Sequence, residues 1–381
     1  MRILVVIYEF PPVGGGGGQV ARDICHGLVK SGHEVRVLTA HLDDLPRQEQ
    51  IDGFQVTRIS SWRRQAYEAD LLAMAGFVIS GSIAGLREIR RWQPDLIHVH
   101  FAVPSGPVAW VLSRYSKIPY VLTAHLGDVP GGVPEKTKNW FRWFYPFTPQ
   151  IWRDASHAIA VSEYTRQLAL KHYPVDIQVI PNGVDLNRLD PGEIKVGNPP
   201  QIIFAGRFVP QKNPLQVVKI LADLQDLPWN CVMLGDGVLR KEVEREVRKH
   251  NLQERIILTG WLTPDKVTQW FAKSDLLYMP SISEGLPVVG VQGLAMGLAI
   301  VASPVGGFVE LVSDGENGYL IQPDQPDKTK ESLRGLLSDP SLLHEYRINS
   351  RQKSVRYDLN KIVNSYNQLF TELASGYTKT G

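Results

Sequence analysis

The chain has 381 residues, of which 43% are hydrophobic and 21% are charged, a balance typical of a globular protein with enough apolar material for two cores. Lys and Arg number 41 against 39 Asp and Glu, so the formal net charge of +2 does not indicate nucleic acid or a strongly acidic partner. Cys25 and Cys231 lie far apart, and we interpret them as reduced core thiols of a cytoplasmic protein.

The N-terminal segment has one basic residue and a short apolar run that stops at Pro11 and Pro12. This pattern predicts a first β-strand rather than a signal peptide. No run of about 18 apolar residues is present, so no membrane-spanning helix is expected. The nearest candidate, residues 71–85, is too short and is followed by charges, and it predicts a buried helix.

Short apolar runs alternate with longer helical patterns through the first half of the chain. The predicted strands are Ile3–Ile7, Glu34–Thr39, Gln55–Ile59, Leu96–His100, Tyr120–Thr123, His157–Val161 and Ile177–Ile180. The predicted helices between them include Val20–Lys30, Ala69–Arg91 and Ser162–Lys171. Such alternation predicts a parallel sheet that is covered on both faces.

A segment rich in Pro, Gly, Asn and Asp, Ile180–Pro200, interrupts this pattern and predicts a linker. The alternation then restarts, with strands predicted at Ile202–Ala205, Cys231–Leu234, Ile256–Leu258, Leu276–Met279 and Ile300–Ala302. Helices are predicted at Pro214–Leu224, Val238–His250 and Pro264–Lys273. Apolar residues from Leu359 to Leu373 recur at helical spacing and predict a C-terminal amphipathic helix.

The expected fold class is therefore α/β, with two doubly wound Rossmann-like domains facing each other across a cleft. We assign residues 1–185 to the first domain, 186–356 to the second, and 357–381 to a helix that packs back on the first. Ligands of such sheets bind beyond the carboxyl ends of the strands.

Five consecutive glycines, Gly14–Gly18, follow the first predicted strand. Glycine lets the backbone approach a ligand, and a helix start offers free N–H groups to an anion. The alternative is a flexible loop. No G-x-G-x-x-G pattern can be aligned here, which argues against a nicotinamide or flavin oxidoreductase.

Charged residues follow predicted strands of both domains. Arg207 and Lys212 lie in one loop and could neutralise a diphosphate, or could be solvated surface charges. Glu284 precedes a helix expected to begin near Leu286 or Pro287, where it could accept hydrogen bonds from sugar hydroxyls or cap the helix. His125 and Asp128 come just after a strand of the first domain.

Together these features resemble the retaining nucleotide-sugar glycosyltransferases of family 4, which have the GT-B fold. The resemblance covers nearly the whole chain and rests on the glycine loop and on "GHEVRVLT", "IHVH", "TAHLGD", "IPNGVD", "AGRFVPQKN", "LGDG", "EGLPVVGVQGLAMGLAIVASPVGGFVELV" and "GENGYLI". Each motif alone is weak, but their order and spacing are highly specific.

The resemblance implies roles for individual residues. The catalytic set is His125, Arg207, Lys212 and Glu284. The donor-binding set is Gly17, Gly18, Gly206, Arg207, Lys212, Gly260, Glu284, Gly285, Leu286, Pro287, Val288 and Gln292. Asp128 lies on the acceptor side, the Leu258–Trp261 segment lies near the base, and Glu310 matches a recurrent family position.

One position departs from the family pattern. The family motif places a second glutamate eight residues after the first, and this chain has Gln292 there. An amide both donates and accepts hydrogen bonds, whereas a carboxylate only accepts. We expect Gln292 to bond the donor ribose less tightly than a carboxylate; a hydrogen bond inside the protein core is the alternative.

The expected reaction moves a hexose from a nucleoside-diphosphate sugar, with a UDP-sugar favoured over GDP-mannose, to a sugar or lipid-linked acceptor. Arg207, Lys212 and helix N–H groups would stabilise the departing diphosphate. No metal or other cofactor is then required, and Asp43 and Asp44 are interpreted as a solvated loop. The sequence offers no convincing nucleophilic carboxylate, which favours a same-face reaction. The alternatives are a nucleotide-sugar epimerase of the same fold and a non-catalytic nucleotide-sugar-binding protein.

Aromatic and basic residues mix in the segment Lys138–Arg153. They could form a peripheral contact with the inner face of a membrane, or line an acceptor site. The alternative, which we favour slightly, is a helix pair that packs into the first domain.

Overall fold

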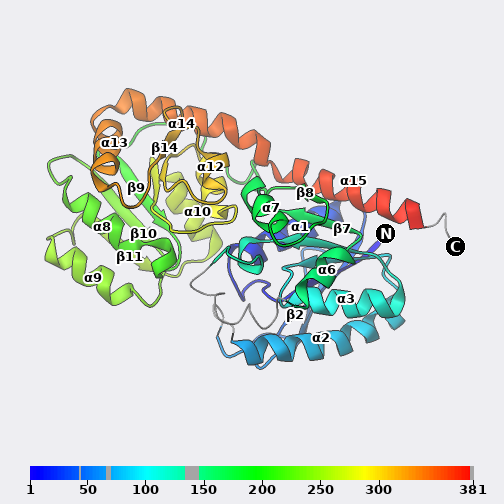
Figure 1. Ribbon diagram of the computed structural model, residues 1–381. Coiled ribbons are helices and arrows are strands. Elements are labelled where there is room, and N and C mark those ends of the chain that lie inside the picture. The colour runs from blue at the N-terminus through cyan, green and yellow to red at the C-terminus, as the bar shows by residue number, and fades with distance from the viewer. Residues whose placement is uncertain (43, 66–69, 134–145, 378–381) are drawn as a thin grey trace. The chain divides into compact units, whose positions relative to one another are not determined.

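The computed structural model describes residues 1–42, 44–65, 70–133 and 146–377. The chain forms two compact units (Figure 1). Unit 1 comprises Met1–Gly183 and Leu359–Gly381, and unit 2 comprises Val184–Asp358. Asp43 and the segment 134–145 lie outside the described residues, and with them Asp43 and the first half of Lys138–Arg153 among the expectations.

Unit 1 contains an eight-stranded sheet in the order β3-β4-β2-β1-β5-β6-β7-β8. The strands are β1 (Arg2–Ile7), β2 (Glu34–Ala40), β3 (Gln48–Ile51), β4 (Phe54–Ile59), β5 (Leu96–His100), β6 (Tyr120–Ala124), β7 (His157–Ala160) and β8 (Ile177–Val179). All neighbours pair in parallel except β3 and β4. The central strands β1, β5 and β6 are almost wholly buried because both faces of the sheet are covered.

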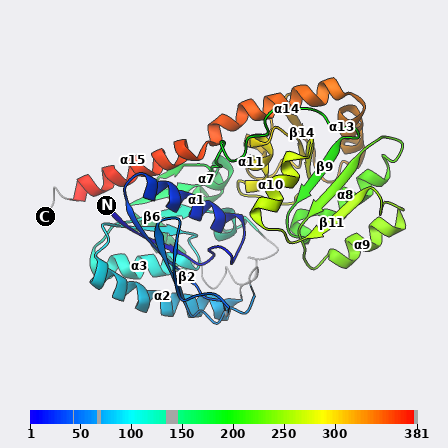
Figure 2. The same ribbon diagram turned by 180° about the vertical axis from the view of Figure 1, so that it is seen from behind.

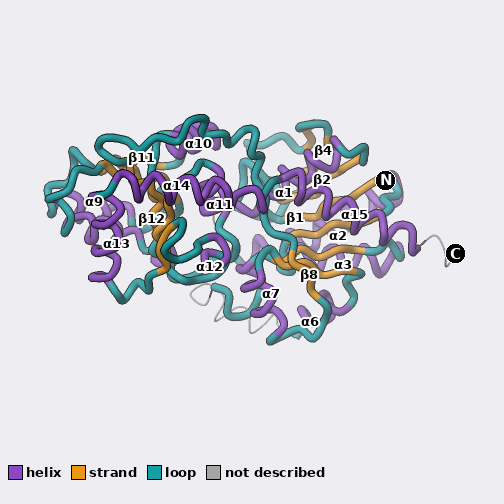
Figure 3. The backbone as a smooth tube through the Cα atoms, turned by 90° about the horizontal axis from the view of Figure 1, so that it is seen from above, coloured by secondary structure: helices purple, strands orange, loops and turns teal. Residues whose placement is uncertain are grey.

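Helices cover both faces of this sheet. They are α1 (Gly16–Lys30), α2 (Leu71–Trp92), α3 (Ser105–Ser116), η1 (Leu126–Asp128), α6 (Thr148–Arg153), α7 (Glu163–Leu170) and α15 (Leu359–Tyr377). α1 and α15 pack together over one face, and α2 packs on α3 over the other (Figures 1 and 2). Seen from above, α1 and α15 cross the strands of unit 1 (Figure 3).

Unit 2 contains a six-stranded, all-parallel sheet in the order β11-β10-β9-β12-β13-β14. Its strands are β9 (Gln201–Ala205), β10 (Asn230–Leu234), β11 (Ile256–Gly260), β12 (Leu276–Met279), β13 (Ala299–Ala302) and β14 (Gly318–Leu320). Its helices are η2 (Pro210–Lys212), α8 (Pro214–Ala222), α9 (Arg240–Lys249), α10 (Pro264–Ala272), α11 (Val288–Ala295), α12 (Phe308–Leu311), α13 (Pro326–Ser338), α14 (Pro340–Ser354) and η3 (Val355–Tyr357).

The predicted α/β class with two Rossmann-like sheets is confirmed, and each predicted strand is present with small shifts at its ends. Three expectations need correction. β3 was not predicted, because its sequence QEQI is polar and pairs as an antiparallel edge strand. α1 begins at Gly16 rather than Val20, so three of the five glycines lie in its first turn.

The third correction concerns α2, which was expected to be a buried helix. Its inner face is buried, but Leu72, Ile79 and Ile83 on its outer face are more than half exposed. α2 is also the one helix in the described ranges that is long and apolar enough to cross a membrane, although its glycine-bearing face packs on α3.

Candidate functional site

The topology of unit 2 brings the predicted donor residues to one edge of its sheet. After β9 the next two strands, β10 and β11, are added on one side of it. The following strands, β12, β13 and β14, are added on the other side. The carboxyl ends of β9 and β12 therefore form the point where the strand order reverses, and doubly wound sheets bind ligands at such points. Gly206, Arg207 and Lys212 follow β9, and Glu284 follows β12.

Lys212 and Glu284 form an ion pair at this edge. The Nζ atom of Lys212 lies 2.5 Å from Oε1 of Glu284, and Ser281 Oγ donates to the same oxygen at 2.8 Å. The Glu284 side chain is 6% exposed and the Lys212 side chain 17%. A buried carboxylate is costly unless it is paired and hydrogen-bonded, and both conditions are met here.

The two loops that carry this pair are fastened to each other. The Ile282 amide donates to the Gln211 carbonyl oxygen at 2.7 Å, and the Gln211 side chain donates to the Ser283 carbonyl oxygen at 3.0 Å. These bonds join segments about seventy residues apart in sequence. The position of the lysine relative to the carboxylate is therefore fixed by the backbone as well as by the ion pair.

The stem of Lys212 passes close to Gly206, at the end of β9. A Cβ atom on Gly206 would lie 3.6 Å from Cγ of Lys212, so a larger side chain would compete with the lysine for space. Arg207 is half-buried beside Gly206. The structure thus brings the predicted residues Gly206, Arg207, Lys212 and Glu284 together.

α11 begins directly after the glutamate loop. Pro287 is its N-cap residue, and the first intrahelical bond runs from the Gly290 amide to the Pro287 carbonyl oxygen at 2.9 Å. The amides of Val288 and Val289 precede that bond, as helix starts require. The capping alternative for Glu284 is wrong, because the helix has no side-chain cap and the carboxylate bonds Lys212 and Ser281 instead.

The support behind this loop was not predicted from the sequence. Gly306 has φ +55°, and a Cβ atom there would overlap the Glu284 carbonyl oxygen. Gly307 donates its amide to the Gly285 carbonyl oxygen. The adjacent glycines after a buried strand were the available signal, because such pairs often mark a close approach of two backbones. Ser281 was also missed, since a lone serine carries no comparable signal.

Gln292 lies in the second turn of α11 and is half-buried. Its side-chain amide makes no hydrogen bond to any residue that the structure describes. The alternative of a core hydrogen bond is therefore not realised, and the amide is available to a ligand. On the same helix Gly290 and Gly293 pack closely against Leu311 and Leu277.

Gly260 ends β11 at the same edge of the sheet, two strands from β9. It has φ +72°, and its carbonyl oxygen accepts a hydrogen bond from the Gly235 amide at 3.0 Å. Trp261 follows and is 45% exposed. Glu310 lies farther along the chain, half-buried in α12.

In unit 1 the start of α1 lies against the residues that follow β5 and β6. A Cβ atom on Gly17 would lie 2.7 Å from the Phe101 ring and 3.6 Å from Nδ1 of His125. One on Gly18 would lie 2.7 Å from the Glu9 carbonyl oxygen. Both glycines are thus required for close packing, and the loop alternative is wrong for this half of the glycine run.

Three buried histidines connect this edge to the C-terminal helix. His125 Nε2 lies 3.3 Å from His100 Nδ1. The His100 ring is tilted against that of His98, with 4.2 Å between the ring centroids, and His98 contacts Tyr366 and Phe370 of α15. Burial lowers the pKa of His98 to about 3 and that of His125 to about 4, and it holds the pKa of His100 well below the usual range. These rings are therefore neutral at pH 7.

Asp128 is buried beside the same edge. Its Oδ2 accepts a hydrogen bond from the Ala102 amide at 2.6 Å, while Oδ1 has no partner among the described residues. Burial raises the pKa of this carboxyl to about 8. Asp128 therefore supports the backbone after β5, and much of it carries a proton at neutral pH.

The described end of the aromatic segment packs inward. Ile151 and Trp152 of α6 are buried, and the Trp152 ring stacks on Tyr173 at 4.6 Å. For this part of Lys138–Arg153 the packing interpretation is confirmed. Phe147 is the exception, at 70% exposed.

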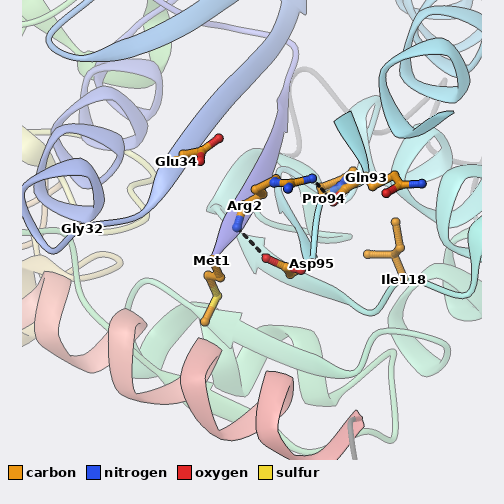
Figure 4. A pocket seen from close by; sticks show the side chains of 8 residues that line it. All are labelled: Met1, Arg2, Gly32, Glu34, Gln93, Pro94, Asp95 and Ile118. Atoms are coloured by element: carbon orange, nitrogen blue, oxygen red, sulfur yellow. Dashed lines mark hydrogen bonds between the residues drawn. The ribbon is translucent and has the colours of Figure 1, made fainter. Parts of the chain in front are cut away.

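A hollow of about 590 Å³ lies at the opposite edge of the unit 1 sheet (Figure 4). It is lined by residues at the amino ends of β1, β2 and β5: Met1, Arg2, Gly32, Glu34, Gln93, Pro94, Asp95 and Ile118. Arg2 is already bonded there, its amide to Asp95 and its guanidinium to the Trp92 carbonyl oxygen. This edge carries none of the predicted site residues.

Comparison with known proteins identifies the chain. The family model described as Glycosyltransferase Family 4 matches residues 14–188, and that described as Glycosyl transferases group 1 matches residues 188–353. The chain is a family 4 glycosyltransferase. It therefore transfers a sugar from a nucleotide-sugar donor, and the predicted recognition, enzyme class and GT-B fold are confirmed.

Two curated relatives and one solved structure illustrate the resemblance. An uncharacterized glycosyltransferase of Methanocaldococcus jannaschii is 29% identical to this glycosyltransferase over 88% of the chain and 95% of the relative. The UDP-Gal:alpha-D-GlcNAc-diphosphoundecaprenol alpha-1,3-galactosyltransferase of Escherichia coli is 27% identical over 73% of each. Sucrose-phosphate synthase from Thermosynechococcus elongatus shares the fold, with a TM-score of 0.85, 19% identity, and coverage of 99% and 100%.

Proposed function

We propose that this glycosyltransferase moves a hexose from a UDP-sugar to a sugar or lipid-linked acceptor with retention of configuration. The observation that carries the proposal is the Lys212–Glu284 pair at the switch point of unit 2. The choice of UDP over GDP, and of a lipid-linked acceptor as one class, is supported by the printed name of the Escherichia coli relative.

In this proposal Lys212 binds the donor diphosphate without releasing Glu284. An ammonium group has three N–H donors, and the ion pair uses one of them. The remaining donors can reach diphosphate oxygens, together with Arg207 and the first amides of α11. Glu284 is held with one oxygen on Lys212 and Ser281, which leaves the other oxygen to accept a bond from a sugar hydroxyl.

The chemistry depends on stabilising the charge that develops on the leaving diphosphate. Fixed cations and oriented amides in a partly buried site stabilise such charge without reorganising during the reaction. No candidate nucleophile stands out, so we favour a same-face reaction in which the leaving phosphate takes the proton of the acceptor hydroxyl. Gly17, His125 and Asp128 of unit 1 keep their predicted roles toward the sugar and the acceptor.

Gln292 bonds the donor ribose in this proposal. Its free amide and its place one turn beyond the helix start support this role. The amide both donates and accepts, so it can pair with either ribose hydroxyl. The location that we propose for the enzyme is the cytoplasm, supported by the two buried free thiols, Cys25 and Cys231.

A nucleotide-sugar panel tests the proposal. Each donor is first screened by the shift that it causes in the melting temperature, and donors that bind are then assayed for release of the nucleoside diphosphate with and without acceptors. A UDP-sugar should stabilise the protein, and diphosphate release should require an acceptor. NMR of the product should show the anomeric configuration of the donor.

The same experiment separates the alternatives. A nucleotide-sugar epimerase would convert its donor without any acceptor. A non-catalytic binding protein would be stabilised by a donor but would release no diphosphate with any acceptor. Stabilisation by GDP-mannose and not by UDP-sugars would overturn the donor assignment alone.

A further inference from the structure

The outer face of α2 carries a line of exposed apolar side chains. Leu72, Ile79 and Ile83 are 70%, 57% and 51% exposed. Ile79 and Ile83 follow Leu72 by seven and eleven residues, which is about two and three helical turns. The three side chains therefore project in nearly the same direction. Arg90, eighteen residues after Leu72, continues the line after about five turns. We call Trp62, Leu72, Ile79 and Ile83 the α2 strip.

Trp62 fills the gap in this line between Leu72 and Ile79. Its ring lies over Gly76, where a Cβ atom would come within 2.7 Å of Cε3 of the indole. The indole is nevertheless 63% exposed, and the residue has φ +54°, a conformation unfavourable for a bulky side chain. Backbone strain that holds a large apolar ring outward is an observation that points to function.

The polar groups near the strip are turned away from solvent. The hydroxyls of Ser80 and Ser82 donate to the carbonyl oxygens of Gly76 and Val78, at 2.6 and 2.7 Å. The opposite face of α2 is committed to the fold, because Gly81 and Gly85 lie against Val108 and Leu112 of α3. α2 can therefore expose the α2 strip to solvent while its other face stays packed in unit 1.

Cations gather at the C-terminal end of the strip. Arg87, Arg90 and Arg91 of α2 are exposed, and so are Arg114 and Lys117 at the end of the neighbouring α3. Glu88 is the only acidic residue in α2 or α3, and its carboxylate is bonded to Arg36. The end of this helix pair thus has a strong positive charge although the whole chain is nearly neutral.

We propose that the α2 strip and the arginines that follow it bind the surface of a bilayer containing anionic lipids, with α2 lying parallel to that surface. Apolar side chains on one side of a helix enter the boundary between headgroups and acyl chains, and Lys and Arg beside them pair with anionic headgroups. An exposed Trp suits that boundary, because its ring is apolar and its N–H group can still reach water.

Two observations favour a bilayer over a protein partner. The strip contains four side chains, whereas a stable protein interface uses about 20 to 30 residues on each side. Apart from Glu88, which is paired with Arg36, the charged residues of α2 and α3 are all basic. This charge complements an anionic lipid surface and would repel a second copy of the same face. This proposal is independent of the proposed reaction and differs in place from the membrane contact expected for Lys138–Arg153.

Co-sedimentation with lipid vesicles tests the proposal. The purified chain is mixed with two kinds of vesicle, at low and at high salt. One kind is phosphatidylcholine alone, and the other is phosphatidylglycerol and phosphatidylcholine in a 3:7 ratio. We expect binding to the anionic vesicles that weakens with salt. The Ile79→Ser/Ile83→Ser variant should bind at least about tenfold more weakly, because two apolar side chains no longer enter the lipid. The Arg87→Gln/Arg91→Gln variant should lose the preference for anionic vesicles.

The matched control is Val238→Ser/Val355→Ser, which changes two valines of unit 2 that are 69% and 50% exposed and should leave binding unchanged. Melting temperature checks that each variant is folded. Lipids with a quencher on the acyl chain should reduce Trp fluorescence in the wild type and less in Trp62→Phe. The proposal fails if the wild type binds neither vesicle, or if the Ile79→Ser/Ile83→Ser variant binds as the wild type does. It also fails if sedimentation equilibrium shows a dimer that this variant dissociates, since the strip would then be an interface between two copies.

Discussion

His100 Nδ1 lies 3.3 Å from His125 Nε2, with both rings buried. Two N–H groups cannot face each other in a hydrogen bond, so one of these nitrogens donates and the other accepts. Both rings are neutral at pH 7, and a neutral imidazole carries one proton. The tautomer of His100 therefore sets that of His125, and with it the hydrogen-bonding role of His125 Nδ1, which lies beside Gly17.

His100→Leu should remove this control and lower kcat/KM about three- to tenfold, the effect of losing one hydrogen bond. His100→Asn should restore much of the activity, because an amide can replace the Nδ1 atom. NMR of ¹⁵N-labelled histidine should show a tautomer change at His125 in the leucine variant. Equal loss of activity in both variants, with an unchanged His125 signal, would mean that His100 acts through packing alone.

Lys212→Ala should lower kcat at saturating donor about 10²- to 10³-fold, the range observed when one fixed group that stabilises developing charge is removed. Lys212→Arg keeps a cation at this position and should retain more activity than the alanine variant. Initial rates of diphosphate release provide the measurement. Turnover of Lys212→Ala within twofold of the wild type would show that the diphosphate binds elsewhere.

The Lys212→Ala variant should also be less stable, by about 1–3 kcal/mol, because the buried Glu284 carboxylate loses its cation. Adding Glu284→Gln removes the uncompensated charge. The double variant should therefore recover melting temperature but not turnover. The double variant should also turn over more slowly than Glu284→Gln alone. If Lys212 were only a structural partner of Glu284, these two variants would have the same turnover.

Gln292→Glu should change donor affinity, because a carboxylate accepts two ribose hydrogen bonds whereas the amide offers one acceptor and one donor group. Isothermal titration with the donor found in the panel measures the change, and we expect tighter binding. Gln253→Glu makes the same change at an exposed position before β11, at the other edge of the sheet, and serves as the control. Unmoved affinity in Gln292→Glu would indicate that this residue does not contact the nucleotide.

Gly306→Ala should displace the Glu284 loop. The added Cβ atom would overlap the Glu284 carbonyl oxygen, and the φ of +55° disfavours alanine. We expect a loss of about 1–3 kcal/mol in stability, together with weaker donor binding. Gly335→Ala, in an exposed part of α13 with open space around it, should be neutral or stabilising. Unfolding in urea and donor titration measure both effects.

Asp128 should make the stability of the protein depend on pH. Its pKa of about 8 in the folded state exceeds the value of about 4 for an unfolded carboxyl. Between these values the folded state holds a proton that the unfolded state has lost, so the free energy of unfolding falls as pH rises through this window.

Asp128→Asn cannot ionise, so the melting temperature of the variant minus that of the wild type should increase from pH 5 to pH 9. The histidines are common to both proteins and cancel in this difference. Asp324→Asn, at an exposed position, should show a flat difference over the same range. A flat difference for Asp128→Asn would place the pKa of Asp128 below the window.

The sequence predicted most of the fold because buried parallel strands are continuous apolar runs that stand out between helical patterns. β3 was not predicted because it is an edge strand with polar residues, and it pairs with the sheet on one side only. The true start of α1 was not predicted because glycine is a poor helix former. Glycine is needed at Gly17 and Gly18 because Phe101 and Glu9 approach the helix closely there.

For the candidate site, the sequence predicted the residue types and the sheet edges but not the contacts. The Lys212–Glu284 pair joins residues 72 positions apart, and only the adjacency of β9 and β12 brings them together. The outward side of α2 was mispredicted because an apolar composition was taken to mean burial. Composition alone cannot show which apolar face packs and which meets solvent.

Unit 2 is inserted into unit 1, since Val184 and Asp358 pair as neighbours where the chain enters and leaves it. During synthesis, all of unit 2 must leave the ribosome before α15 can reach His98 and the rest of unit 1. Unit 2 can therefore reach its native state while the first 183 residues still lack the helix that covers part of their sheet. A chain cut short after Asp358 would keep the Lys212–Glu284 pair and lose the Tyr366 and Phe370 rings that pack against His98.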